Sequence, residues 1–222
     1  MNTFKKIFGT PDLRNKILFT IALLTVTRIA AHIPIPGVSL ENLKQYFDQN
    51  AIFGLLDVFS GGTISNFSII LMGVGPYINA SIIMQLLTMI IPSLENLSKE
   101  SQQGRDKINQ YTRILTVPLA LLQSYGTIAL LTQQNVISGI HGTDLYIALI
   151  TATAGCIFLM WLGELITERG IGNGISMIIT VGIIAGVPKQ IRNLLALAQA
   201  DSSKIWVFLI VVAAVVLFTA LV

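Results

Sequence analysis

Long apolar runs without a charged residue recur along this chain, and they constrain its fold more than any other feature. The stretches 67–91, 114–132, 145–163 and 205–222 contain no Asp, Glu, Lys or Arg. About 20 such residues in a helix cross the roughly 30 Å hydrocarbon core of a bilayer. A closed β-barrel would need short alternating strands, which these continuous runs do not provide. We therefore predict an all-α, polytopic transmembrane helical bundle.

The composition agrees with lipid as the solvent of this chain. Of its 222 residues, 53% are hydrophobic and 11% are charged, and the mean hydropathy is +0.74. A soluble core of that size cannot hide so much apolar surface. We predict six crossings, at 17–33, 67–91, 114–132, 145–163, 175–187 with some extension, and 205–222.

The two ends of the sequence lead to two further expectations. Residues 1–16 are polar and basic, and no small-residue cleavage site follows the next apolar run, so we expect a retained first span. The last residue lies inside an apolar run without a polar flank. We interpret the chain as the N-terminal portion of a longer protein or as an unusually shortened one.

The distribution of Lys and Arg predicts a cytoplasmic N-terminus, because cytoplasmic loops carry an excess of these residues. With that orientation the cytoplasmic side receives Lys5, Lys6, Arg14, Lys16, Lys99, Arg105, Lys107, Arg113 and Arg169. The other side receives only Lys44, Lys189, Arg192 and Lys204.

Two segments differ from ordinary spans. Residues 51–66 are apolar at first, then contain Gly61 and Gly62, and are too short to cross on their own. They favour either a buried re-entrant half-helix in a cavity or a short amphipathic helix on the outer surface. The fifth apolar stretch ends at Val187, before Pro188, and its shortness suits a helix inside the bundle.

No enzyme signature is present in the sequence, since HExxH, GxSxG and P-loop motifs are all absent. The single cysteine, Cys156, excludes an intramolecular disulfide and a CxxC metal site. We expect no catalytic residue, cofactor or metal. The GIGNG string at 170–174 follows a span rather than a strand, and predicts a tight cytoplasmic turn.

Few ionisable residues fall within the predicted spans. Arg28 is close enough to the outer end of the first span for its side chain to extend to that surface. Glu164 lies at the cytoplasmic end of the fourth span, where pairing with a neighbour such as Arg169 is the default expectation.

Aliphatic residues four positions apart share a helix face in two spans. Val74 and Ile78 do so in the second span, and Ile175 and Ile179 in the fifth. If these faces meet, they form an apolar ring that excludes ions yet deforms around an extended polypeptide. The spacing by itself is a weak signal, because such pairs also occur in ordinary helix packing.

Several uncommon strings occur in order along the chain. They are RIAAHIPIPG at 28–37, FSGG at 59–62, GPYINASIIMQLL at 75–87, GRDKINQYTR at 104–113 and MWLGELITERGIGNGIS at 160–176. Together these strings closely resemble the SecY family, the central subunits of bacterial protein-conducting channels. The resemblance implies a ten-span fold of two pseudo-symmetric halves. This chain would supply a cytoplasmic segment at 1–16, the first half-bundle at 17–200, and a truncated sixth helix at 201–222.

The resemblance also assigns roles to individual residues. It implies a plug at about 53–68 that includes Leu55, Leu56, Val58, Phe59, Ser60, Gly61 and Gly62. It places Val74, Ile78, Ile175 and Ile179 in a hydrophobic pore ring. It assigns Ile82, Gln85 and Leu86 to one side of a lateral gate.

The function that the resemblance implies is secretion of preproteins and membrane insertion of nascent proteins, without enzymatic activity. The expected partners are SecE and SecG subunits, a ribosome or the SecA motor, signal sequences, nascent chains and lipids, in the bacterial inner membrane. Cytoplasmic contacts are expected at Lys99, Arg105, Lys107 and Arg113. Two other interpretations stay open: a small-solute transporter with a broken helix, and a non-conducting scaffold or insertase.

Overall fold

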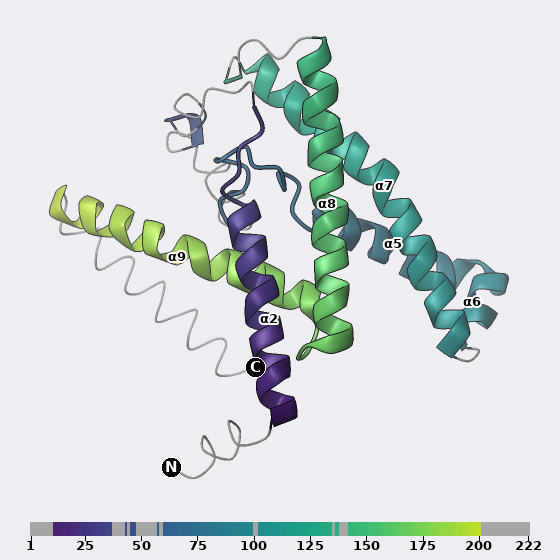
Figure 1. Ribbon diagram of the computed structural model, residues 1–222. Helices are drawn as coiled ribbons and strands as arrows, with labels where there is room; N and C mark the ends of the chain where they lie inside the picture. The colour runs from purple at the N-terminus through teal and green to yellow at the C-terminus, as the bar shows by residue number, and fades with distance from the viewer. Residues whose placement is uncertain are drawn as a thin grey trace. The chain divides into compact units, whose positions relative to one another are not determined.

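The computed structural model describes residues 11–36, 43, 45–47, 57, 60–99, 102–134, 136–137 and 142–200. Within these residues there is no strand, and one isolated β-bridge joins Pro34 to Ser68. The helices are α2 (Pro11–Ala30), α5 (Gly75–Ile90), α6 (Pro92–Lys99), α7 (Gln102–Gln133), α8 (Thr143–Arg169) and α9 (Gly174–Ala200) (Figure 1). The prediction of an all-α fold is confirmed.

The chain divides into two compact units, Met1–Ile183 and Ile184–Val222. The described part of the second unit is the later portion of α9, which continues as a helix through Pro188 to Ala200. The apolar stretch that ends at Val187 therefore does not mark the end of the fifth helix. The predicted sixth span, 205–222, lies outside the described residues.

Helices α7 and α8 contain the third and fourth predicted spans, and each is long and apolar enough to cross a membrane. The pair α5 and α6 passes the same test together, but it is bent by 104° at the break between the two helices. Within the described residues, length and composition thus support two crossings, or three with the bent pair. The six crossings stay a prediction.

Small and hydroxyl-bearing residues line the buried face of α7 at intervals of four. They are Thr112, Thr116, Ala120 and Ser124, followed by Ile128. Small side chains let two helix backbones approach closely, which is the usual way helices associate in lipid. This face accounts for the packing of α7 against α5 and α8.

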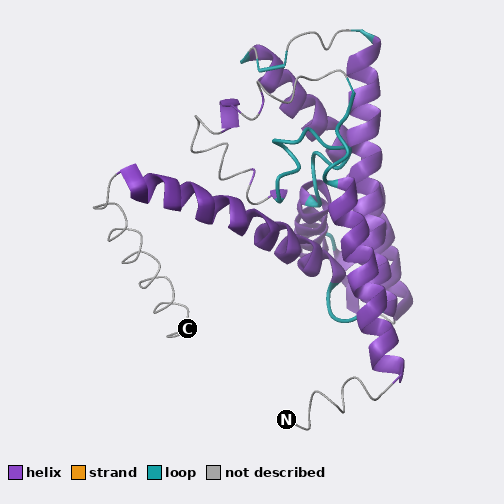
Figure 2. Ribbon diagram, turned by 60° about the vertical axis from the view of Figure 1, so that its left-hand side comes forward, coloured by secondary structure: helices purple, strands orange, loops and turns teal. Residues whose placement is uncertain are grey.

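The second predicted span, 67–91, is wrong in its first part. The helix begins only at Gly75, with Pro76 in its first turn, and residues 61–74 are turns and loop (Figure 2). The backbone of this stretch pairs with the segment after α2: the amide of Ile35 donates to the carbonyl of Phe67 at 2.8 Å, and the amide of Ile69 donates to that of Ile33 at 2.9 Å. These contacts satisfy backbone groups that a helix would otherwise satisfy internally.

The non-helical stretch packs directly on the backbone of α8. A Cβ atom added at Gly155 would collide with the carbonyl oxygen of Ile69. Only glycine permits this approach, so the position of Gly155 fixes where residues 69 and 70 rest on α8. Phe67 and Ile70 are both fully buried there.

The GIGNG turn is as tight as predicted. Gly172 has a φ of 70°, and the side chain of Asn173 accepts a hydrogen bond from the amide of Ser176 at 3.1 Å, which caps α9. The amide of Gly174 donates to the Thr167 hydroxyl at 2.9 Å. The amide of Ile171 donates to the hydroxyl of Thr20 at 3.2 Å, which ties this turn to α2.

Candidate functional site

The four predicted ring residues lie in one apolar cluster. Val74 immediately precedes α5 and Ile78 is in its first turn, while Ile175 and Ile179 are in the first two turns of α9. Val74 is a buried member of the cluster, and the other three pack against it. We call this the central cluster; its buried members are Ala30, Ala31, Ile70, Val74, Leu159, Leu162, Ile166 and Ile178.

A cavity of about 330 Å³ adjoins the central cluster. Its aliphatic wall includes Val74, Ile78 and Ile179, whereas Ile175 belongs to the cluster but does not line the cavity. Further apolar residues of the lining include Ile70, Leu159 and Ile178, and a polar part of the lining comes from the end of α2 and from the turn at residues 60–63. It includes Thr27, Arg28, Ser60 and Thr63.

The turn at residues 60–63 is the described part of the predicted plug, together with Asp57 and residues 64–68. Leu55, Leu56, Val58 and Phe59 lie outside the described residues, as does most of the segment that would form a re-entrant half-helix. Gly61 and Gly62 have φ angles of 71° and 82°, a conformation that glycine adopts without strain. The two glycines therefore form the sharp corner of this segment.

Asp57 holds the turn together, and sequence reasoning gave it no role. It is 7% exposed, and its Oδ1 accepts a hydrogen bond from the amide of Ser65 at 2.9 Å. Its carbonyl accepts from the amide of Gly62 at 2.8 Å and from the hydroxyl of Ser60 at 2.9 Å. The available signal was an acidic residue shortly before a Gly-Gly corner, a pattern typical of side-chain-stabilised turns.

Arg28 does not extend to the outer surface as expected. Its side chain lines the cavity, and its Nη1 donates a hydrogen bond to the carbonyl of Gly61 at 3.3 Å. The expectation failed because it considered only the distance along the helix to the surface. A backbone carbonyl brought close by the fold gives the guanidinium a nearer partner.

The predicted gate residues lie on a face of α5 that is not covered by the described chain. Ile82 is 49% exposed and Leu86 is 54% exposed, and Gln85 is exposed between them. The opposite face, with Pro76, Ala80 and Met84, is buried. An uncovered apolar face of this kind requires lipid or another polypeptide as its neighbour.

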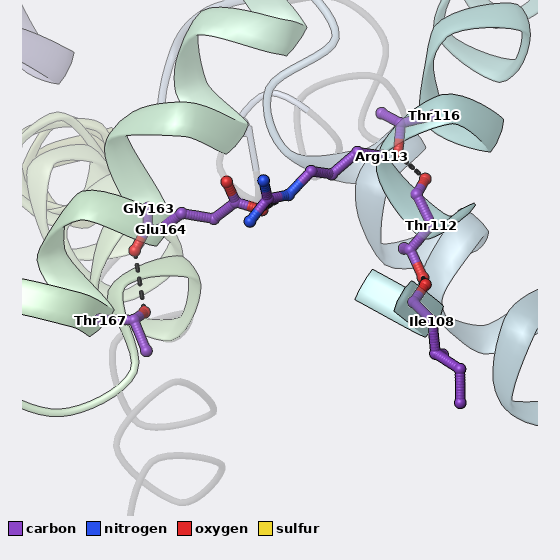
Figure 3. Close-up of polar contacts among 7 residues, drawn as sticks. All are labelled: Ile108, Thr112, Arg113, Thr116, Gly163, Glu164 and Thr167. Carbon is purple, nitrogen blue, oxygen red and sulfur yellow. Dashed lines mark hydrogen bonds and ion pairs between the residues drawn. The ribbon is translucent and has the colours of Figure 1, made fainter. Parts of the chain in front are cut away.

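The four predicted cytoplasmic basic residues fall into two groups. Arg105 and Lys107 are exposed in the first turns of α7. Lys99 forms an ion pair with Glu95 at 2.5 Å, one turn earlier in α6. Arg113 pairs across helices, because its Nε donates to the Glu164 carboxylate of α8 at 2.6 Å (Figure 3).

The pairing of Glu164 with Arg113 overturns the expectation of local pairing at the end of α8. Figure 3 shows the two side chains pointing toward each other between α7 and α8. The neighbouring hydroxyls of Thr112, Thr116 and Thr167 donate to backbone carbonyls four residues earlier in their own helices. The interhelical polar contact at this level is therefore the ion pair.

Comparison with known proteins places the chain in a family. The family model of SecY matches residues 68–222. The protein translocase subunit SecY of Corynebacterium glutamicum is 46% identical over 210 residues, which cover 88% of this chain and 47% of that protein. The chain thus spans about half the length of the curated relatives it matches.

Two solved structures share the fold. One is Sec61 in the canine ribosome-channel complex from the endoplasmic reticulum, with a TM-score of 0.55 and 22% identity, covering 75% of this chain and 35% of Sec61. The other comes from work on the plug domain of SecY, described as stabilising the closed state of the translocation channel. It has a TM-score of 0.53 and 24% identity, covering 79% of this chain and 36% of the other. From the family match and the identity to the relative, this chain belongs to the SecY family.

Proposed function

We propose that this chain supplies part of a protein-conducting channel that secretes preproteins and inserts nascent proteins into the membrane. The observation that carries the proposal is the cavity with an aliphatic wall at Val74, Ile78 and Ile179 and the turn at residues 60–63 in its lining. Membership of the SecY family supports it. No bond is made or broken in this function.

The chemistry of the cavity lining suits a seal that opens for polypeptide. Branched aliphatic side chains offer no hydrogen-bond partner to water or ions, so a narrow aliphatic collar dewets and blocks conduction. The same side chains move aside for an extended chain of any sequence. We assign Val74, Ile78, Ile175 and Ile179 to this collar, with the segment at 53–68 as the plug that closes the passage.

The exposed face of α5 suits the exit of hydrophobic segments toward lipid. Ile82 and Leu86 offer apolar contact, and Gln85 offers an amide between them. A signal sequence that moves from this face into the bilayer exchanges apolar side chains of α5 for apolar lipid tails. We assign the three residues to one side of a lateral gate.

The proposal also covers the membrane location, the topology and the partners of the whole protein. The chain forms the first half-bundle, at 17–200, and the start of a sixth helix, at 201–222, in the bacterial inner membrane with a cytoplasmic N-terminus. Its partners are SecE and SecG, signal sequences, nascent chains and lipids. A ribosome or the SecA motor supplies polypeptide; the structural likeness to Sec61 in a ribosome complex supports the first of these.

Photocrosslinking tests the proposal directly. A photoreactive amino acid replaces Val74 in the full-length protein, and a secretory polypeptide is stalled during translocation. We expect the stalled polypeptide to crosslink at this position. The matched control places the same amino acid at Ile147, which is half-exposed on α8 and does not line the cavity.

Two outcomes would contradict the proposal. Equal crosslinking from Val74 and Ile147 would mean that the cavity is not the path of the polypeptide. Saturable uptake of a defined small solute, without polypeptide capture, would favour a transporter with a broken helix, for which the non-helical stretch before α5 is the structural argument.

Ribosome binding tests the cytoplasmic contacts. Replacing Arg105 and Lys107 by Glu removes two exposed cations that phosphates of ribosomal RNA would attract. We expect weaker ribosome binding and a smaller dependence of affinity on salt. Lys99 and Arg113 are expected to contribute less, because each already pairs with a carboxylate. Unchanged binding, with topology intact, would contradict this assignment.

A further inference from the structure

We propose that Arg28 and a contact between Gly61 and Gly182 together form a latch that holds the turn at residues 60–63 in the cavity. The inference rests on the proposed function and deepens it, because it names what retains the plug segment in the closed state. Arg28 is a positioning residue here.

Three segments far apart in the sequence converge at this point. Arg28 comes from the last turn of α2, Gly61 from the corner of the plug segment, and Gly182 from α9. Arg28 and Gly182 both line the cavity. Disturbing any one of the three therefore acts on the other two.

The contact between the two glycines is a backbone contact. A Cβ atom on Gly61 would lie 2.8 Å from the Cα of Gly182 and 3.0 Å from its carbonyl oxygen. Real Cβ atoms do not approach backbone so closely, so a side chain at residue 61 lifts the turn away from α9. A Cβ atom on Gly182 would lie 3.7 Å from the Cα of Gly61, which is an ordinary contact.

Arg28 closes the latch from the side of α2. Its Nη1 donates to the Gly61 carbonyl at 3.3 Å. Its Nε is buried without a hydrogen-bond partner, so the guanidinium is only partly satisfied in this state. A single long hydrogen bond with an unsatisfied neighbouring donor suits a contact that must release.

The hydrogen-bond donors of Arg28 also explain how the turn can leave the cavity without leaving the guanidinium unpaired. When the turn departs, Arg28 loses the Gly61 carbonyl, and an extended polypeptide in the cavity brings backbone carbonyls of its own. These carbonyls can accept from Nη1, whatever the sequence of the polypeptide. Arg28 thus exchanges one backbone carbonyl for another as the plug segment leaves.

Two glycine variants distinguish the loss of the Gly61–Gly182 contact from the backbone strain that any side chain at a positive φ causes. Gly61→Ala and Gly62→Ala both force a side chain into a positive φ, but a Cβ on Gly62 meets only the Asn66 side chain, at 3.9 Å. We measure resting ion conductance of the full-length protein, reconstituted with its partner subunits, in planar bilayers with potassium chloride. We expect Gly61→Ala to conduct about tenfold more than Gly62→Ala, given what overpacking costs. Equal conductance would overturn the Gly61–Gly182 contact.

A second variant tests the cation without altering backbone conformation. Arg28→Met removes the donor and keeps an unbranched chain, Arg28→Lys keeps a charged donor, and Arg14→Met is a control on the exposed part of α2. The readout is the labelling rate of Ser60→Cys by a charged maleimide added from outside, in a Cys156→Ser background. We expect Arg28→Met to speed labelling by about 3- to 10-fold, the range for an ordinary hydrogen bond, because the bond to Gly61 is long, and we expect Arg28→Lys to restore part of the protection.

The outcomes distinguish the latch from the proposed function. Labelling of Arg28→Met no faster than that of Arg14→Met would overturn the latch, even if Val74 still crosslinks to stalled polypeptide. If neither Arg28→Met nor Gly61→Ala changes its readout, the plug segment is held by other contacts. Combining the two substitutions should give less than the sum of their effects, because both release the same turn.

Discussion

The helical frame of this chain and its non-helical stretch at residues 60–74 are stabilised in different ways. The pair α7 and α8 consists of long, regular helices whose backbone groups are satisfied within each helix, joined by small side chains and one ion pair. The described residues 60–74 have almost no regular structure, and hydrogen bonds from Ser60 and Ser65 to Asp57 stabilise their first turns. The α7–α8 pair therefore keeps its shape. The non-helical stretch, in contrast, can leave its site without the unfolding of any helix.

Where the two regions touch, substitution should have its largest effect. Gly155→Ala places a methyl group against the carbonyl of Ile69, and we expect it to lower the free energy of unfolding by about 3 kcal/mol. The control is Gly126→Ala in α7, where an added Cβ meets nothing within 4 Å and helix propensity predicts a gain of up to about 1 kcal/mol. Thermal unfolding in detergent measures both. Similar melting temperatures would mean that residues 69 and 70 do not rest on α8 at Gly155.

A smaller effect should come from the side chain that organises the plug segment. Asp57→Ala removes the acceptor for the Ser65 amide, and a buried unsatisfied donor costs about 1–3 kcal/mol. Asp57→Asn keeps an oxygen acceptor for the Ser65 amide, so we expect it to lower the stability of the turn by less. We expect the labelling rate of Ser60→Cys to rise in the alanine variant and to stay near the original in the asparagine variant. Faster labelling in both would show that charge, and not the hydrogen bond, holds the turn.

The smallest expected effect concerns the ion pair within the frame. The Arg113 side chain is 45% exposed and that of Glu164 is 18% exposed, so solvent screens their attraction. A double-mutant cycle with Arg113→Gln and Glu164→Gln should give a coupling energy of about 0.5–1 kcal/mol that shrinks with added salt. A coupling of zero at low salt would mean that α7 and α8 are joined by packing alone.

The sequence predicted the frame well because a membrane leaves few choices for an apolar chain. The continuous runs at 114–132 and 145–163 fall within α7 and α8, whose lengths follow from the need to satisfy backbone groups internally. The tight turn before α9 followed from its glycines and Asn173. The ring residues could be named only through the family resemblance, since their four-residue spacing is ordinary in helices.

What the sequence did not predict depends on contacts between distant segments. The start of α5 was placed too early because residues 67–74 are as apolar as a span. Their pairing with residues 33–35 and the positive φ angles of Phe67 and Gly73 keep them out of a helix. Arg28 was expected at the surface and Glu164 in a local pair, because their partners are distant in sequence. Asp57 is a different case, because its partner Ser65 is only eight residues away and an acidic residue before a Gly-Gly corner was a readable local signal.

The central claim is that the aliphatic side chains around the cavity form the seal of the channel, and resting conductance tests it most directly. The full-length protein with Ile78→Asn or Ile179→Asn is compared in planar bilayers with the control Ile147→Asn, which places the same amide on the exposed face of α8. We predict that the first two variants conduct ions at rest, because an amide in the collar holds water where aliphatic groups exclude it, and that the control stays closed. Resting conductance equal to that of the control would contradict the claim.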